Sequence, residues 1–183
     1  IIGSGSIGQV YLIQSKSIIE NNESKFVMKI LHPNVKYEIN FFRKFYKIMT
    51  YIPFIKNRIN SNFPFNIHEF INQFYKQSDF ISESNHLLYF NEFYKDNQYI
   101  ITPRLIQTSP TIMIMSYEEG ESFDNLTLND YHKYKLVTLF ALFIKNNHHI
   151  LNYNHGDLHK GNWRIKLCED NNHKVIIYDY GFC

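Results

Sequence analysis

Runs of β-branched and aromatic residues recur along the chain and predict a series of short strands. Most of these runs are bounded by Gly, Pro, Asn or Ser, which favour turns. The predicted strands are Ile1–Val10, Tyr11–Ser17, Phe26–Ile30, Tyr99–Ile106, Thr111–Tyr117, Trp163–Leu167 and Lys174–Tyr178. A polar turn at Glu20–Ser24 is expected to join the second strand to the third, and the last two strands are expected to pair.

Apolar residues at helical spacing predict helices between these strands. Asn34 is expected to cap a helix that ends near Met49, with a stripe of Ile39, Phe42, Phe45, Tyr46 and Met49. Ile67–Tyr75 predicts a second helix, and Gln77–Tyr94 predicts a third helix or a continuation of the second. The intervening Tyr51–Phe65 contains two prolines and is predicted to be a loop.

The last predicted helix, Asp130–Leu151, has an expected buried face of Leu136, Leu139, Phe140, Phe143 and Ile144. Before it, Glu118–Glu121 breaks the hydrophobic pattern and marks the best boundary between two lobes. Residues 1–119 would form a strand-rich lobe with extra helices at about 34–77, and residues 120–183 would begin a mainly helical lobe. This arrangement predicts an α+β fold.

Composition and charge exclude several classes of protein. The 183 residues suffice for one domain with a core or for two small lobes. The formal net charge is +2 without any run of Lys or Arg, so no nucleic acid is expected as a partner. The longest apolar run, Leu136–Ile144, is too short to span a bilayer, so no transmembrane segment is expected in this chain. Cys168 and Cys183 are the only cysteines, which favours a reducing intracellular compartment.

Two short motifs near the C-terminal end of the chain carry candidate chemistry. Residues 155–162 read His-Gly-Asp-Leu-His-Lys-Gly-Asn, and residues 179–181 read Asp-Tyr-Gly. Kinase-fold enzymes use an Asp, an Asn five positions later and a second Asp to place one catalytic carboxylate and two metal ligands. Asp157 would thus accept or orient the proton of the attacking hydroxyl, while Asn162 and Asp179 would hold Mg²⁺ against nucleotide phosphates. Either motif alone would also fit an ordinary turn or strand end.

The glycine-rich start of the chain predicts a phosphate-binding loop. Gly3, Gly5 and Gly8 fit the pattern G-x-G-x-x-G, which also occurs in dinucleotide-binding folds. Those folds need a helix after the glycines, whereas here the glycines run into the β-rich segment Val10–Ile13. Backbone amides of the loop would therefore lie over phosphates. Lys29 is the candidate for the lysine that binds the α- and β-phosphates, unless it is an ordinary lysine at a strand end.

An active kinase fold also needs a carboxylate on a helix to hold this lysine in place. Glu83 is the candidate, because Phe80, Leu87 and Phe90 fall on the same side of its predicted helix. That side would face the core, so we expect a Lys29–Glu83 ion pair. The alternative is a solvated surface glutamate.

Four motifs follow one another in an order that resembles one family. They are S-I-G-Q-V at residues 6–10, V-x-K-[VI]-x-H-P at 27–33, D-[FY]-x-x-E-[AS] at 79–84 and H-G-D-L-H-x-G-N at 155–162. In these motifs, and in the long interval between Lys29 and Glu83, the chain resembles the UbiB family. This family comprises the aarF-type atypical kinases associated with isoprenoid-quinone lipid synthesis.

The resemblance implies a two-lobed protein-kinase-like fold in which residues 1–183 form a single partial domain with a truncated C-lobe. It implies ATP or ADP and Mg²⁺ as cofactors. Ser6 in the nucleotide loop and the main chain of Met115 and Tyr117 would contribute to nucleotide binding. The expected activity is phosphoryl transfer or ATP hydrolysis linked to a lipid or quinone precursor, with a membrane surface as the expected place of action.

The chain departs from the family pattern at several positions. Gly3 and Gly5 replace the alanines that are common in the family's nucleotide loop, and Gln77 stands where a glutamate is usual. Lys160 replaces the usual proline in the catalytic loop and would either neutralise charge near a transferred phosphoryl group or face solvent.

Two other functions stay open. A small-molecule phosphotransferase of the aminoglycoside or choline kinase type shares the pattern H-G-D-x-x-x-x-N. A non-catalytic nucleotide-binding scaffold is the second alternative, although a decayed site would not need to keep Lys29, Glu83, Asp157 and Asp179.

Overall fold

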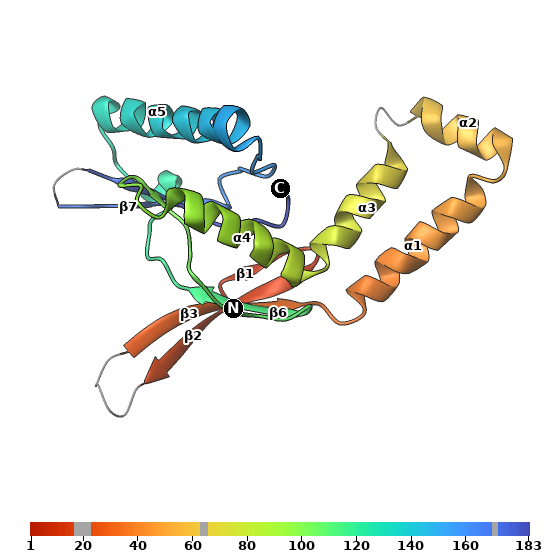
Figure 1. Ribbon diagram of the computed structural model, residues 1–183, viewed down its shortest axis with the longest axis horizontal. Helices are drawn as coiled ribbons and strands as arrows, with labels where there is room; N and C mark the ends of the chain where they lie inside the picture. The colour runs from red at the N-terminus through yellow and green to blue at the C-terminus, as the bar shows by residue number, and fades with distance from the viewer. Residues whose placement is uncertain (17–22, 63–65, 170–171) are drawn as a thin grey trace.

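The computed structural model describes residues 1–16, 23–62, 66–169 and 172–183, and its strands form two sheets (Figure 1). The first sheet is antiparallel and has the strand order β1-β2-β3-β6-β5. Its strands are β1 (Gly3–Ser4), β2 (Gly8–Lys16), β3 (Glu23–Leu31), β5 (Leu105–Thr108) and β6 (Ile112–Ser116). The strand-rich part predicted within residues 1–119 is therefore confirmed, and these five strands form one antiparallel sheet.

The first hairpin differs from the prediction, in which one strand ends at Val10 and the next begins at Tyr11. Its turn lies at residues 5–7 rather than between residues 10 and 11, and the Gly5 N–H donates to the Gly8 carbonyl across it at 2.9 Å. A Cβ atom on Gly8 would lie 2.5 Å from the Ile30 carbonyl oxygen, so glycine is needed for this close approach to β3. Of the predicted turn Glu20–Ser24, residues 20–22 lie outside the described residues, and the last two residues belong to β3.

The second sheet is small and mixed. It contains β4 (Ile100–Ile101), β8 (Lys174–Ile177) and β7 (Trp163–Lys166), with β4 parallel and β7 antiparallel to β8. The predicted single strand Tyr99–Ile106 is wrong, because its first part forms β4 in this sheet and its last part enters β5 in the other. Pro103 lies between the two parts and has no N–H to donate to a ladder.

The helices are α1 (Val35–Met49), α2 (Pro53–Asn62), α3 (Ile67–Gln77), α4 (Phe80–Tyr94) and α5 (Asp130–Asn146), which continues as a π-helical turn at Asn147–Leu151. The predicted loop over Tyr51–Phe65 is wrong for residues 53–62, which form α2, and residues 63–65 lie outside the described residues. Pro53 occupies the first position of α2, where a helix does not need the missing N–H.

The two predicted helix starts differ in their caps. Asn34 stands at the N-cap of α1, but its backbone is left-handed (φ 67°) and its side chain makes no capping hydrogen bond. Asp79 caps α4 instead of letting it continue α3, because its carboxylate accepts the Ile81 N–H at 3.1 Å.

Helices α1, α2 and α3 form an arm that extends away from the sheets (Figure 1). Within α1 only Val35 and Ile39 are buried. The exposed side chains of α1 include a stripe of large apolar residues at helical spacing, Tyr37, Phe41, Phe45 and Ile48. The described part of the chain contains no helix that is both long and apolar enough to cross a bilayer.

Helix α4 is the element around which the core is built (Figure 1). Its side chains Leu87 and Phe90 are fully buried, and the Phe90 ring lies 6.2 Å from that of Phe143 on α5. Of the face predicted for α5, Leu136 and Phe143 are buried, whereas Ile144 is 54% exposed and was wrongly placed there. Since α4 packs against β5 and β6 as well, it fixes any side chain on its buried face relative to the first sheet.

Candidate functional site

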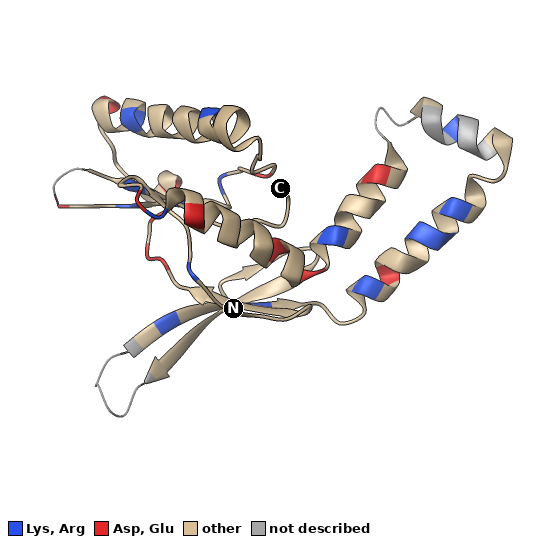
Figure 2. Ribbon diagram, viewed as in Figure 1, with Lys and Arg blue, Asp and Glu red and all other residues tan. Residues whose placement is uncertain are grey.

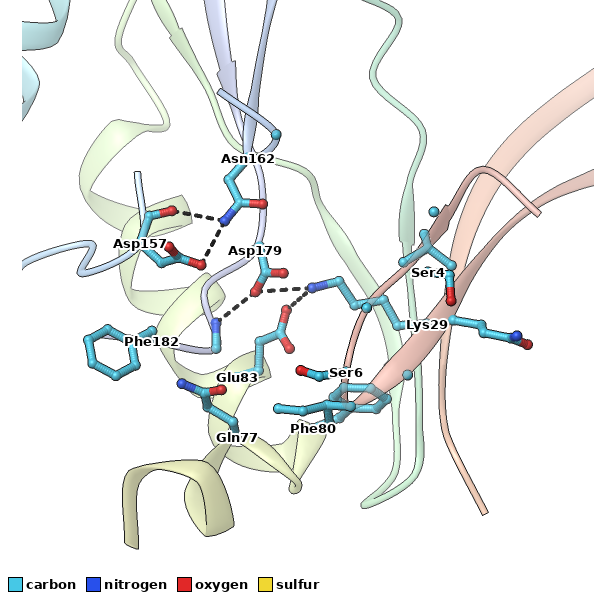
Figure 3. Close-up of a pocket in the computed structure, with 18 of the residues that line it drawn as sticks. Ser4, Ser6, Lys29, Gln77, Phe80, Glu83, Asp157, Asn162, Asp179 and Phe182 are labelled. Atoms are coloured by element: carbon cyan, nitrogen blue, oxygen red, sulfur yellow. Dashed lines mark hydrogen bonds and ion pairs between the residues drawn. The ribbon is translucent and has the colours of Figure 1, made fainter. Parts of the chain in front are cut away.

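A cleft of about 480 Å³ lies between the glycine-rich loop, β3, α4 and the two C-terminal motifs (Figure 3). It brings together nine of the eleven predicted site residues: Gly3, Gly5, Ser6, Gly8, Lys29, Glu83, Asp157, Asn162 and Asp179. Met115 and Tyr117 do not line it. Residues far apart in sequence thus share one concave site, which is the usual location of binding and catalytic groups.

Lys29 and Glu83 form the predicted ion pair inside this cleft. Along β3, Lys29 lies two positions from the buried Val27 and two from the buried Leu31, so its side chain points to the same side of the sheet as theirs. Glu83 is 4% exposed on α4. The Lys29 Nζ contacts Glu83 Oε1 and also lies 3.4 Å from Asp179 Oδ1 (Figure 3).

The charges of these three residues depend on one another. Burial alone would lower the pKa of Lys29, but the Glu83 and Asp179 carboxylates outweigh it and raise this pKa above its ordinary value. Burial raises the pKa of Glu83, against the opposing effect of Lys29. The charge of Lys29 lowers the pKa of Asp179, so this carboxylate stays ionised at neutral pH. The three residues therefore form one unit, in which the Lys29 cation is held between the Glu83 and Asp179 carboxylates.

Asp179 adopts a backbone conformation that is uncommon for a non-glycine residue, with φ 57°. It lies two residues after the end of β8, and its Oδ1 accepts the Gly181 N–H at 3.2 Å. The next side chain, Tyr180, is 2% exposed and its ring packs 4.9 Å from that of Phe90 on α4. His86, also on α4, donates through its Nδ1 to the Tyr180 carbonyl at 2.8 Å. These contacts fix the strained position of Asp179.

The loop from His155 to Asn162 is joined to the same strand end. His155 Nε2 donates to the Tyr178 carbonyl at 2.9 Å, and burial lowers the pKa of this histidine, which favours the neutral ring. The Tyr178 N–H donates to the Asn162 carbonyl at 2.7 Å. Asn162 Nδ2 in turn donates to the carbonyl and to Oδ2 of Asp157, at 2.8 and 3.2 Å. The catalytic-loop carboxylate therefore has a defined orientation.

The donor set fits Mg²⁺. Asn162 uses its Nδ2 on Asp157, which leaves its amide oxygen for a cation. Asp179 uses Oδ1 on Lys29 and Gly181, and no hydrogen bond among the described residues involves its Oδ2. One carboxylate and one amide oxygen are hard ligands, and Mg²⁺ takes few protein ligands when phosphates supply the others.

The glycine-rich loop leaves room over the cleft. A Cβ atom on Gly5 would have no heavy atom nearer than 4.0 Å, and one on Gly3 would be in ordinary contact with Val10 at 3.6 Å. His32 Nε2 lies 3.0 Å from the Gly5 carbonyl and ties the loop to the end of β3. Of the three loop glycines, only Gly8 is thus required by close packing within the chain.

The nucleotide-binding role of Met115 and Tyr117 stays a prediction. Met115 is 4% exposed in the core, and the Tyr117 N–H already donates to the Lys25 carbonyl at 3.3 Å, so this amide is not free for adenine. Conversely, Gln77, Phe80 and His159 line the cleft without having been predicted as site residues. Phe80 and His159 lie inside the family motifs at residues 79–84 and 155–162, and Gln77 lies two residues before the first of them. Their place in or near these motifs is the sequence feature that could have predicted them as site residues.

Comparisons with known proteins agree with this geometry. The family model described as "ABC1 atypical kinase-like domain" matches residues 1–183, which confirms the resemblance inferred from the motifs. A relative from Dictyostelium discoideum, named probable serine/threonine-protein kinase abkC, is 31% identical over 188 residues. That match covers 98% of this chain and 26% of the relative, so the chain spans about a quarter of its length.

Two solved structures share the fold. Rv3197 of Mycobacterium tuberculosis, solved in complex with erythromycin, superposes with a TM-score of 0.74 at 20% identity, over 99% of this chain and 44% of that one. Rio2 kinase of Chaetomium thermophilum, solved as an ADP/Mg²⁺-phosphoaspartate complex, has a TM-score of 0.53 at 14% identity. That match covers 98% of this chain and 46% of the Rio2 chain. The kinase-like fold is therefore established.

Removing the cation alone should destabilise the protein more than removing the buried pair. Lys29→Met leaves Glu83 buried without its partner and should lower the free energy of unfolding by about 3–5 kcal/mol. Adding Glu83→Leu removes the stranded carboxylate, so the double variant should recover at least half of the loss. Urea unfolding of the native chain and both variants measures this. A double variant no more stable than Lys29→Met would show that the unpaired Glu83 carboxylate is not what destabilises the single variant.

Proposed function

The chain belongs to the ABC1 atypical kinase-like family, and on this basis we propose that it binds MgATP and transfers or hydrolyses the γ-phosphoryl group. One observation carries the proposal: the Lys29 cation, held by Glu83, also pairs with Asp179 at 3.4 Å inside the cleft that contains Asp157 and Asn162. Phosphoryl transfer is catalysed mainly by positioning and by charge neutralisation, and these residues supply both.

Each group in the cleft has a role in this proposal. The loop of Gly3, Gly5, Ser6 and Gly8 places backbone amides over the phosphates. Lys29 binds oxygens of the α- and β-phosphates, and Asp157 orients the attacking hydroxyl or water. Asn162 and Asp179 would hold Mg²⁺, which when bound neutralises charge on the β- and γ-phosphates.

We propose that the acceptor is a lipid or quinone precursor and that the protein works at a membrane surface. The support comes from α1, whose exposed stripe Tyr37, Phe41, Phe45 and Ile48 would insert between lipid headgroups. Helix α1 also carries three lysines and one arginine, Lys36, Arg43, Lys44 and Lys47. Figure 2 shows basic positions along this helix. A helix that combines aromatic and basic side chains in this way fits an anionic lipid surface.

Binding of MgATP should stabilise the native chain and not an Asp179→Asn variant. Asparagine tolerates the left-handed backbone found at Asp179, so the substitution removes the charge without adding strain. MgATP at about 100 times its Kd should add about 2.7 kcal/mol, which for a domain of this size raises the Tm by about 5–10 °C. Differential scanning fluorimetry with ATP, with and without Mg²⁺, makes the measurement. An equal shift in both proteins would exclude Asp179 as a metal ligand, and no shift in either would favour the scaffold alternative.

Binding to vesicles should depend on the aromatic stripe of α1. Phe41→Ser with Phe45→Ser should reduce co-sedimentation with phosphatidylserine-containing vesicles roughly tenfold or more, because each buried Phe contributes about 1.5–3 kcal/mol. Tyr131→Ser with Tyr134→Ser on α5 removes two aromatic residues that are even more exposed than the two phenylalanines and serves as the matched control. Equal binding by the two double variants would exclude α1 as the lipid-facing surface.

The small-molecule phosphotransferase alternative is tested by the acceptor. Rv3197 was solved with erythromycin, so a macrolide belongs in the test beside an aminoglycoside, choline and a quinone-precursor lipid. The proposed function predicts that only the lipid raises the rate of ATP turnover. Stimulation by one of the other compounds and not by the lipid would favour the alternative.

A further inference from the structure

His159 occupies a constrained position beside the carboxylate of the catalytic loop. Its ring lines the cleft, and its Nδ1 accepts the Gly161 N–H at 2.9 Å. Because Nδ1 is an acceptor, the neutral ring carries its proton on Nε2. This Nε2 lies 3.6 Å from Asp157 Oδ2, a few tenths of an ångström beyond a normal hydrogen bond.

Gly161 provides the space that the ring occupies. A Cβ atom at this position would lie 2.6 Å from His159 Cε1 and 2.9 Å from Nδ1. Any other residue would therefore push the imidazole out of its place. The φ angle of Gly161 is not positive, so the need for glycine here comes from the space for the ring and not from the backbone conformation. The same residue thus supplies both the hydrogen bond that sets the tautomer and the room for the ring.

The two oxygens of the Asp157 carboxylate have different surroundings. Oδ2 is approached by Asn162 Nδ2 at 3.2 Å and by His159 Nε2. No hydrogen bond among the described residues involves Oδ1. The Asn162 hydrogen bond and the nearby His159 N–H both lie on the Oδ2 side of this carboxylate, which leaves Oδ1 available to a bound acceptor.

We propose that His159, seated on Gly161, is a positioning residue that makes Asp157 Oδ1 the proton-accepting atom. The inference rests on the proposed function, in which the acceptor hydroxyl gives its proton to Oδ1. The hydroxyl oxygen then forms its bond to the γ-phosphorus as the bond to the leaving ADP oxygen breaks. A misdirected carboxylate slows this step without weakening nucleotide binding.

The neighbouring Lys160 does not share this role. Its Nζ pairs with Asp124 Oδ2 at 2.7 Å, its side chain is 74% exposed, and it does not line the cleft. Of the two arrangements expected for Lys160, the structure has the one that faces solvent. Lys160→Ala is therefore a suitable neighbouring control.

Three variants separate positioning from folding. His159→Leu removes the N–H, His159→Gln keeps one near the place of Nε2, and Gly161→Ala keeps the histidine but displaces its ring. With the native chain, kcat for MgATP turnover should fall roughly tenfold to a hundredfold in His159→Leu and Gly161→Ala. Nucleotide Kd should change less than about twofold, since positioning acts on the transition state. His159→Gln should recover part of kcat, and Lys160→Ala should match the native chain.

An unchanged kcat in His159→Leu, a loss confined to KM, or a Gln variant no better than Leu would overturn the proposal. Long-range ¹H–¹⁵N NMR of the imidazole tests the same arrangement without turnover. The expected result is a proton on Nε2 and none on Nδ1 in the native chain, with this preference lost in Gly161→Ala. A native ring protonated on Nδ1 would overturn the proposal. Failure of the proposed function would instead appear as absent MgATP binding with the expected tautomer intact.

Discussion

The site depends on one buried cation. The Lys29 ammonium lies between the Glu83 and Asp179 carboxylates, and each of the three residues comes from a different part of the fold. An ammonium group without partners would be too costly to bury, and here two carboxylates pair with it. The first sheet, α4 and the end of the β8 region are therefore held in one arrangement by the same interaction that prepares the cleft for phosphates.

The remaining contacts of the site extend from this interaction. Tyr180 packs on Phe90, which ties the residue after Asp179 to the helix that carries Glu83. His155 and Asn162 bond to Tyr178 on the other side of Asp179, so the catalytic loop follows the same strand end. The proposed catalytic carboxylate, the metal ligands and the phosphate-binding lysine are thus positioned by the core and not by flexible loops alone. This preorganisation is what phosphoryl transfer requires of a protein.

Sequence patterns predicted the parts of the fold that depend on local periodicity. Glu83 was identifiable because helical spacing places it among Phe80, Leu87 and Phe90, and burial confirms that face. Helix α2 was missed because the two prolines of Tyr51–Phe65 favoured a loop, whereas Pro53 in fact begins the helix. The split of Tyr99–Ile106 between two sheets depends on tertiary pairing, which a continuous β-type run does not reveal. The place of His159 depends on the backbone of its loop, which motif spacing does not specify.

The most direct test is a crystal structure of this chain with Mg²⁺ and a non-hydrolysable ATP analogue. We expect the phosphates under residues 3–8, the Lys29 Nζ bound to an oxygen of the α- or β-phosphate, and one Mg²⁺ ligated by both Asn162 and Asp179. Glu83 should still hold Lys29. A nucleotide bound elsewhere, or bound in the cleft without contact to Lys29 and with Mg²⁺ away from Asp179, would contradict the proposed site.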